Sequence, residues 1–199
     1  MKIHLYILTA LSLLLASCSS YSIVNSHVYD NAAIARHKTF HIVDLKMGSL
    51  PPRMDHATFE CIVASIRSQM LERGYKESAN SPLLINFAVT VHDDTPLSPA
   101  GHEIVDGPYL SCTYPCYIIP QDHYLDDHYL ESGVIKAIYQ QGVLTIDVVN
   151  LKERAPLYTS SVSSIFDLEG NYLDLAEIDK AVDKLFSDYP VPPLPQYRQ

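Results

Sequence analysis

The residues of this chain that could bind a metal gather in one long polar stretch. Histidine and carboxylate side chains recur between residues 92 and 128, at His92, Asp93, Asp94, His102, Glu103, Asp106, His123, Asp126, Asp127 and His128. Imidazole and carboxylate groups together can bind a divalent transition metal. The stretch contains no HExxH pair and no calcium-loop pattern, and solvated polar loops have the same composition. His102, His123 and His128 are therefore the candidate ligands, while our prediction is that the protein carries no metal and no other cofactor.

The same stretch, residues 93–133, is rich in tyrosine and is longer than an ordinary connection. The tyrosines are Tyr109, Tyr114, Tyr117, Tyr124 and Tyr129, interleaved with apolar residues such as Ile118 and Ile119. Tyrosine is common at protein interfaces because it offers a large contact area with a polar tip. We therefore consider these residues as a partner surface. The interpretation we favour is that they fold back and cap an open face of a sheet, and a third is an extra hairpin that extends the sheet.

The first cysteine, Cys18, ends a segment whose charged, apolar and small residues follow the order found in a secretory signal peptide. Lys2 precedes the apolar run Ile3–Leu15, and Leu15-Ala16-Ser17-Cys18 places small residues before the cysteine. This arrangement resembles the lipobox of bacterial lipoproteins, in which residues 1–17 are removed and Cys18 carries lipid. A transmembrane helix needs roughly 20 apolar residues, more than this run provides. A plain signal peptide that does not use Cys18 is the other alternative.

The lipobox resemblance implies where the protein resides. Bacterial lipoproteins carry a diacylglyceryl group and usually a third acyl chain such as palmitate, and two or more chains hold a protein firmly to a bilayer. Ser19 rather than aspartate follows Cys18, which by resemblance to proteobacterial sorting favours the outer membrane, facing the periplasm. The membrane is therefore the first expected partner, through lipidated Cys18.

Three cysteines follow Cys18, and two of them are close in sequence. Cys112 and Cys116 are separated by three residues and could form a disulfide, which an exported compartment permits. Cys61 falls in a helical pattern and is expected to be a small buried apolar residue. The odd count leaves at least one thiol without a partner inside the chain. Thiolate zinc binding is not favoured, because such a site needs four ligands.

Charge and motifs exclude several classes of function. Without residues 1–17, of which only Lys2 is charged, the chain has 182 residues and a net charge of −10. An acidic surface argues against nucleic-acid binding through phosphates. The chain has no G-x-S-x-G serine, no phosphate-binding loop and no dinucleotide fingerprint, so we expect no enzymatic activity. Proteins, cationic ligands and peptidoglycan are compatible with the charge.

Apolar periodicity predicts five strands and two helices. Strands are expected at residues 23–29, 38–45, 83–92, 143–150 and 157–166, with a turn at Asp30-Asn31. In the later strands the serines Ser160, Ser161, Ser163 and Ser164 are expected to point outward. Asp147 is also expected to point outward, to solvent or to a cross-strand partner. One helix should begin after Asp55 and end at Gly74, and a second should begin at Asn171 or Asp174 and stop before Pro190. Short connections between the late strands favour a mostly antiparallel sheet with two helices packed on one face.

This order predicts one α+β domain, a two-layer sandwich at residues 23–190. A short tether at residues 18–22 would join it to the lipid, and the proline-rich tail at residues 191–199 is expected to be extended or disordered. The size suits a single domain.

Several segments, taken in order, resemble the bacterial lipoprotein family called domain of unknown function 4136. They are Lys38-Thr39-Phe40, Leu71-Glu72-Arg73-Gly74-Tyr75, Leu83-Leu84-Ile85-Asn86-Phe87, the strand from Gln141 to Asn150, and Asp188-Tyr189-Pro190. Members usually carry tryptophan where this chain has Tyr158, which could still act as an aromatic plug with a polar tip. The resemblance implies the α+β fold and an envelope location, and it supplies no catalytic or binding residue.

Three hypotheses about function follow. The first is a non-enzymatic, lipid-anchored envelope protein whose domain binds another envelope component, with an envelope protein as the expected partner. The second is a metal carrier or metal-dependent hydrolase that uses the histidine-rich stretch. The third is a structural lipoprotein without a specific ligand. The sequence makes no prediction of the oligomeric state.

Overall fold

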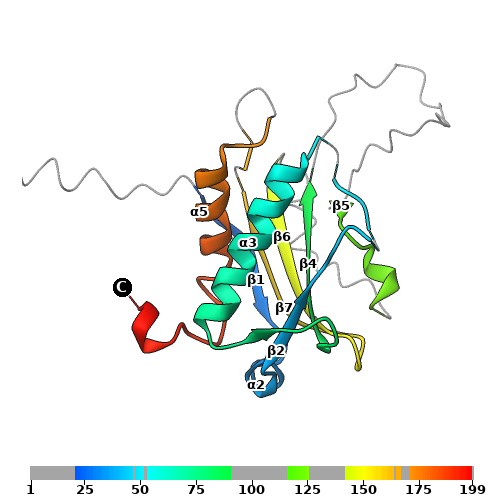
Figure 1. Cartoon of the computed structure of the whole chain (residues 1–199), viewed down its shortest axis with the longest axis vertical. Coiled ribbons are helices and arrows are strands. Elements are labelled where there is room, and N and C mark those ends of the chain that lie inside the picture. Colours follow the sequence, from blue (N-terminus) through cyan, green and yellow to red (C-terminus); the bar gives the residue numbers. More distant parts are fainter. Residues whose placement is uncertain are drawn as a thin grey trace, which may run out of the picture.

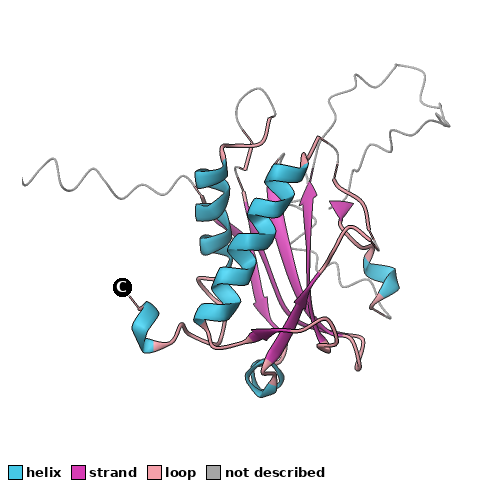
Figure 2. Cartoon of the chain, viewed as in Figure 1, coloured by secondary structure: helices cyan, strands magenta, loops and turns pink. Residues whose placement is uncertain are grey.

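The structure, a computed structural model, describes residues 21–46, 48–51, 53–90, 116–125, 142–163, 165–166 and 171–198. These residues contain a seven-stranded mixed sheet and three α-helices. Helices α3 (His56–Glu72) and α5 (Leu175–Leu185) lie side by side on one face of the sheet, which makes two layers (Figures 1 and 2). The third helix, α2 (Asn31–Arg36), lies at one end of the sheet, where a turn had been expected. The predicted α+β class is confirmed.

The strands pair mostly antiparallel, as predicted. Their spatial order is β1-β7-β6-β4-β2-β3, with β5 also paired to β4. The bounds are β1 Ile23–Val28, β2 Thr39–Ile42, β3 Lys76–Glu77, β4 Leu83–Thr90, β5 Cys116–Tyr117, β6 Val143–Asn150 and β7 Ala155–Val162. Only β2 forms parallel pairs, with β3 and β4. Parallel strands need a crossover connection, and α3 provides it between β2 and β4.

Helices α3 and α5 both begin at an aspartate. The Asp55 carboxylate accepts the Thr58 N–H at 2.7 Å, and the Asp174 carboxylate accepts the Glu177 N–H at 3.0 Å, so each satisfies a backbone donor that has no partner inside its helix. Helix α3 is followed by Gly74, whose φ of +84° is the left-handed conformation that glycine adopts without steric cost. The predicted caps at Asp55 and Gly74 are confirmed.

The core between the layers contains a buried tyrosine at the position where the resemblance implies tryptophan. Tyr158 on β7 is fully buried and donates a hydrogen bond to the Leu185 carbonyl at 2.6 Å. Its ring meets that of Tyr189 edge to face, with centroids 5.2 Å apart. The expected plug with a polar tip is therefore present, and its hydroxyl ties β7 to the end of α5.

The late-strand residues predicted to point outward are not exposed to solvent, whereas the cross-strand partner that was the alternative for Asp147 is present in Thr159. Asp147 is 4% exposed, and Ser160, Ser161 and Ser163 are all buried, whereas Ser164 lies outside the described residues. Ser160 alternates with Tyr158 and so shares its helix-facing side. On the other side, Ile118, Ile119 and Tyr124 are buried and cover the sheet around Asp147. Both faces of β4 and β6 are therefore buried along their whole length.

Both ends of the described chain are held to the domain. Tyr21, predicted to lie in the short tether at residues 18–22, is 5% exposed, and the Ser163 N–H donates to the Ser22 carbonyl at 3.1 Å. In the tail, the Leu194 N–H donates to the Glu72 carbonyl at 2.8 Å, so residues 190–198 fold back against the end of α3. Of the two alternatives expected for the tail, extended or disordered, the second is wrong for residues 191–198. No helix in the described part of the chain is both long enough and apolar enough to span a bilayer.

Candidate functional site

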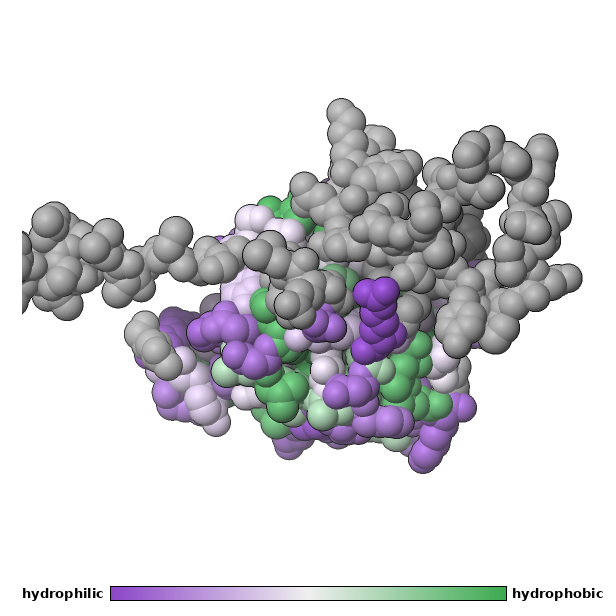
Figure 3. Space-filling view, turned by 90° about the horizontal axis from the view of Figure 1, so that it is seen from above, coloured by the Kyte–Doolittle hydropathy of each residue, from purple (hydrophilic) through white to green (hydrophobic). Residues whose placement is uncertain are grey.

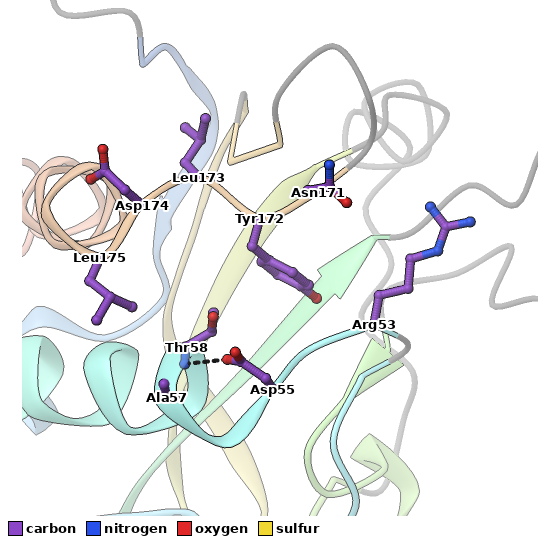
Figure 4. A pocket seen from close by; sticks show the side chains of 9 residues that line it. All are labelled: Arg53, Asp55, Ala57, Thr58, Asn171, Tyr172, Leu173, Asp174 and Leu175. Atoms are coloured by element: carbon purple, nitrogen blue, oxygen red, sulfur yellow. Dashed lines mark hydrogen bonds between the residues drawn. The ribbon is translucent and has the colours of Figure 1, made fainter.

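A cleft of about 500 Å³ opens where α3 and α5 begin (Figure 4). Its walls come from both helix starts and from the segments before them: Arg53, Asp55, Ala57, Thr58, Asn171, Tyr172, Leu173, Asp174 and Leu175. Two parallel helix N-termini concentrate the positive ends of two helix dipoles at one place. Such an arrangement can attract an anion, but here each helix start already has its own carboxylate.

The two capping aspartates decide the electrostatics of this cleft. The hydrogen bond from the Thr58 backbone lowers the pKa of Asp55, so this carboxylate is ionised at neutral pH. The negative charges of Asp55 and Asp174 offset the helix dipoles and occupy the backbone donors that an anion would use. The cleft is therefore better suited to contact with a surface of mixed polarity than to phosphate binding.

Tyr172 and Arg53 shape the mouth of the cleft. The Tyr172 ring points between Asp55 and Arg53 in Figure 4 and packs edge to face on Phe166, with centroids 4.6 Å apart. Burial raises the pKa of the Tyr172 hydroxyl, so it is neutral at physiological pH. Arg53 has φ of +61°, a conformation that costs a non-glycine residue about 1–2 kcal/mol. Leu175, the first residue of α5, is 48% exposed beside these groups.

A second polar cluster, centred on the buried Asp147 and Asn86, lies on the sheet face opposite the helices. The Asp147 carboxylate accepts hydrogen bonds from Thr159 at 2.7 Å and from Gln121 at 2.6 Å, and it also pairs with the Tyr117 hydroxyl. Beside it, the Asn86 amide donates to the Tyr124 hydroxyl at 2.8 Å. These six residues come from strands β4, β5, β6 and β7 and from the segment at residues 116–125.

Burial dominates the chemistry of this cluster. Loss of solvent raises the pKa of Asp147, and the hydrogen bonds from Thr159, Gln121 and Tyr117 partly oppose that rise. Burial also raises the pKa values of Tyr117 and Tyr124, so both hydroxyls stay protonated and can donate. The hydrogen bonds of the cluster tie the segment at residues 116–125 to the sheet. We therefore assign the cluster a role in holding residues 116–125, the covering segment, against the sheet.

Of the predicted site residues that the structure describes, Tyr117 and Tyr124 come together in the cluster around Asp147. Tyr124 is 4% exposed and cannot offer a partner surface, so for this residue the capping interpretation holds. Tyr117 points its hydroxyl at Asp147. His123 is exposed, and no group of three or more potential metal ligands occurs among the described residues. Seven of the predicted residues lie outside the described residues: Cys18, His102, Tyr109, Cys112, Tyr114, His128 and Tyr129.

The cysteines that the structure describes differ from one another. Cys116 is disulfide-bonded, and its predicted partner, Cys112, lies outside the described residues. Cys61 has a free thiol, partly exposed rather than buried as expected, which donates to the Leu175 carbonyl at 3.3 Å. This contact joins α3 to the start of α5 beside the cleft.

The sequence predicted the Asp55 cap and gave Asp174 as one of two alternatives for the second cap, with Asn171, but it did not predict the cleft that the two aspartates line. Each cap is a local signal, an aspartate just before an apolar helical repeat. Their convergence depends on the parallel arrangement of α3 and α5, which pairs residues more than one hundred positions apart. Tyr21 and Arg53 carried no signal in the sequence.

A mixed sheet covered by two parallel helices defines a single α+β domain with a small cleft at the helix starts. The chain belongs to the family described as Domain of unknown function (DUF4136), whose pattern matches residues 24–191. Neither a curated protein nor a solved structure gives a significant match.

Proposed function

We propose that this protein is a lipid-anchored component of the bacterial envelope whose α+β domain is a non-enzymatic binding or structural module. Its location would be the outer membrane, facing the periplasm. The proposal combines the lipobox-like order Leu15-Ala16-Ser17-Cys18 with the attachment of Tyr21 to the domain. The attachment of Tyr21 is the main observation behind this proposal. With Tyr21 fixed to the domain, a lipid on Cys18 would restrict the orientation of the domain relative to the membrane.

Tyr21 is held at the start of α5. Its hydroxyl donates to the Glu177 carboxylate at 2.6 Å, and Glu177 also accepts from Lys180 at 2.5 Å. Burial raises the pKa of Tyr21, so the hydroxyl remains a donor. The chain enters β1 two residues later, at Ile23. The first residues of the domain are thus fixed to the edge of the cleft.

The span between Cys18 and Tyr21 is short. Three residues reach at most about 11 Å when fully extended. A lipid on Cys18 would therefore bring the start of α5 and the exposed Leu175 close to the bilayer. Figure 3 views this end of the molecule and shows hydrophilic and hydrophobic residues interspersed in its coloured part. Such a surface suits contact with lipid headgroups rather than insertion into the hydrocarbon core.

The first experiment tests the lipid. Cells expressing the full chain are labelled with an alkyne analogue of palmitate, and the N-terminal peptide is identified by mass spectrometry. We expect label on a peptide that begins at Cys18, and an unlabelled, unprocessed chain for Cys18→Ala. Cys61→Ala is the matched control and should label normally. A mature N-terminus at another residue would contradict the proposal.

A second experiment tests the orientation. Single nitroxide labels at Leu175→Cys and Leu151→Cys, in a Cys61→Ala background, compare two exposed leucines at opposite ends of the domain. In vesicles, we expect the label at residue 175 to be the more strongly relaxed by a lipid-soluble collider. Equal relaxation at both positions, with normal acylation, would contradict the orientation but leave the lipid anchor in place.

A further inference from the structure

A groove of about 450 Å³ runs between helix α3 and the outer edge of strand β2, away from the cleft. Its floor is apolar and well buried: Phe59 and Val63 come from α3, and Ile42 comes from β2. Glu77, Ser78 and Ala79 also line the groove. The groove therefore has a hydrophobic floor with a strand edge along one wall.

The edge of β2 is covered over only part of its length. Strand β3 has two residues, and its pairing with β2 ends where the Ser78 N–H donates to the Phe40 carbonyl at 2.8 Å. The chain then turns away, since the Ser81 N–H bonds back to the Ser78 carbonyl. The uncovered part of β2 begins directly beyond this point.

Ile42 presents backbone hydrogen-bonding groups at that uncovered part. The Val43 N–H donates to the Ile85 carbonyl at 3.0 Å, so Val43 faces β4. Backbone groups alternate between the two sides of a strand, so those of Ile42 face the outer side, as those of Phe40 do. Within the described residues, neither group of Ile42 has a backbone partner. An unpaired edge of this kind is a template for another extended chain.

The charge on the rim indicates which chain would fit. Asp44, Glu60 and Glu77 supply three carboxylates, and the ion pair between Glu77 and Arg67, at 2.6 and 3.2 Å, leaves Asp44 and Glu60 as the excess negative charge. The rim is therefore acidic on balance, and opposite charge on a partner gives specificity and faster association.

We propose that this groove, named here the β2 groove, binds an extended, basic segment of a partner protein by adding it as a strand beside Ile42. Backbone hydrogen bonds would supply register, and alternate side chains would divide between the apolar floor and the acidic rim. A segment that alternates apolar and lysine or arginine residues meets both requirements, because successive side chains of a strand point to opposite sides. The proposal does not depend on the lipid anchor.

The test uses the full chain in detergent micelles and a fluorescein-labelled peptide of alternating valine and lysine. Fluorescence anisotropy should show saturable binding, while a valine–glutamate peptide should not bind. Ala79→Trp fills the groove from an exposed position and should weaken binding at least tenfold. Ala57→Trp, exposed in the other cleft, is the matched control and should leave binding unchanged. Glu60→Lys should weaken binding about two- to fivefold, and Glu153→Lys should not.

A measurement at the edge of β2 distinguishes strand addition from non-specific ionic binding. Hydrogen exchange at the Ile42 amide should slow on peptide binding, and it should not slow in Ala79→Trp. Binding that leaves exchange at Ile42 unchanged would overturn the proposal. Self-association of the chain that is abolished by Ala79→Trp would also overturn it, because the occupant would then be a second copy.

Discussion

The guanidinium of Arg73 lies 5.2 Å from the centre of the Phe186 ring and donates a hydrogen bond to the Phe186 carbonyl at 3.3 Å. It also donates to the Gln69 carbonyl at 2.9 Å. Arg73 therefore places a positive charge at the C-terminal ends of both α3 and α5. Parallel neighbouring helices have aligned dipoles, which repel. Arg73 at one end, with Asp55 and Asp174 at the other, offsets that repulsion.

Replacing Arg73 tests this arrangement. In Arg73→Lys, the ammonium cannot reach both carbonyls while also stacking on the Phe186 ring, so we expect the free energy of unfolding to fall by about 2–3 kcal/mol. Urea denaturation measures the change. Arg36→Lys, at an exposed position on α2, should change stability by no more than about 0.5 kcal/mol. Equal stability of the two variants would show that Arg73 does not hold the helix ends together.

Asp147 should give the protein a stability that depends on pH. Burial raises the pKa of its carboxyl above the usual 3.8, so the folded state binds the proton more tightly than the unfolded state. The stability from this group is fully present below pH 3.8, and it is lost as the pH rises through the folded-state pKa. Asp147→Asn removes the titration, so the variant should gain stability relative to wild type between pH 4 and 7.

Urea denaturation at several pH values measures that difference. Gln121→Leu provides a second check, because it removes a hydrogen bond to the ionised carboxylate. The pKa of Asp147 should then rise further, and the loss of stability with pH should be larger than in wild type. Parallel curves for wild type and Asp147→Asn would contradict the assignment of a raised pKa.

The sequence could predict those features whose signals are local. Helix α3 has an aspartate cap, a regular apolar repeat and a terminal glycine, all within twenty residues, and it forms as expected. The alternation in β4 and β6 likewise predicted two strands correctly. Helix α2 was missed because it has only six residues, and Asp30-Asn31 is equally typical of a turn.

The remaining features depend on contacts between distant segments. Alternation on β6 predicted that Asp147 points outward, to solvent or to a cross-strand partner. Thr159 is that partner, but residues 116–125 also cover Asp147, and no local pattern indicates this second cover. Arg73 belongs to the segment on which the family resemblance rests, yet its partner Phe186 is 113 positions away. The cleft and the β2 groove both arise from the placement of α3 against other elements. They could not be predicted without the topology.

Asn86 should control how firmly the covering segment is held. Its amide donates to the Ile119 carbonyl at 2.6 Å and to the Tyr124 hydroxyl, and its oxygen accepts from the Phe87 N–H. Asn86→Ala leaves these buried groups unpaired, so we expect a loss of about 2–4 kcal/mol in stability.

Hydrogen exchange followed by mass spectrometry should also show faster exchange across residues 116–125 in Asn86→Ala. Asn80→Ala, at an exposed position, should leave exchange in that segment unchanged. If Asn86→Ala destabilises the whole domain without a selective effect on residues 116–125, Asn86 does not act through the covering segment.

Replacing Gly74 distinguishes two effects at the end of α3, backbone strain and steric crowding. Its φ of +84° disfavours a side chain, whereas a methyl group there would meet Leu194 at 3.5 Å, an ordinary contact distance. Gly74→Ala should therefore cost about 1 kcal/mol through the backbone alone. Adding Leu194→Ala should not restore that loss, and the two effects should be additive within about 0.5 kcal/mol in urea denaturation. Recovery of stability in the double variant would mean that crowding by the C-terminal tail, rather than the left-handed backbone, requires glycine at this position.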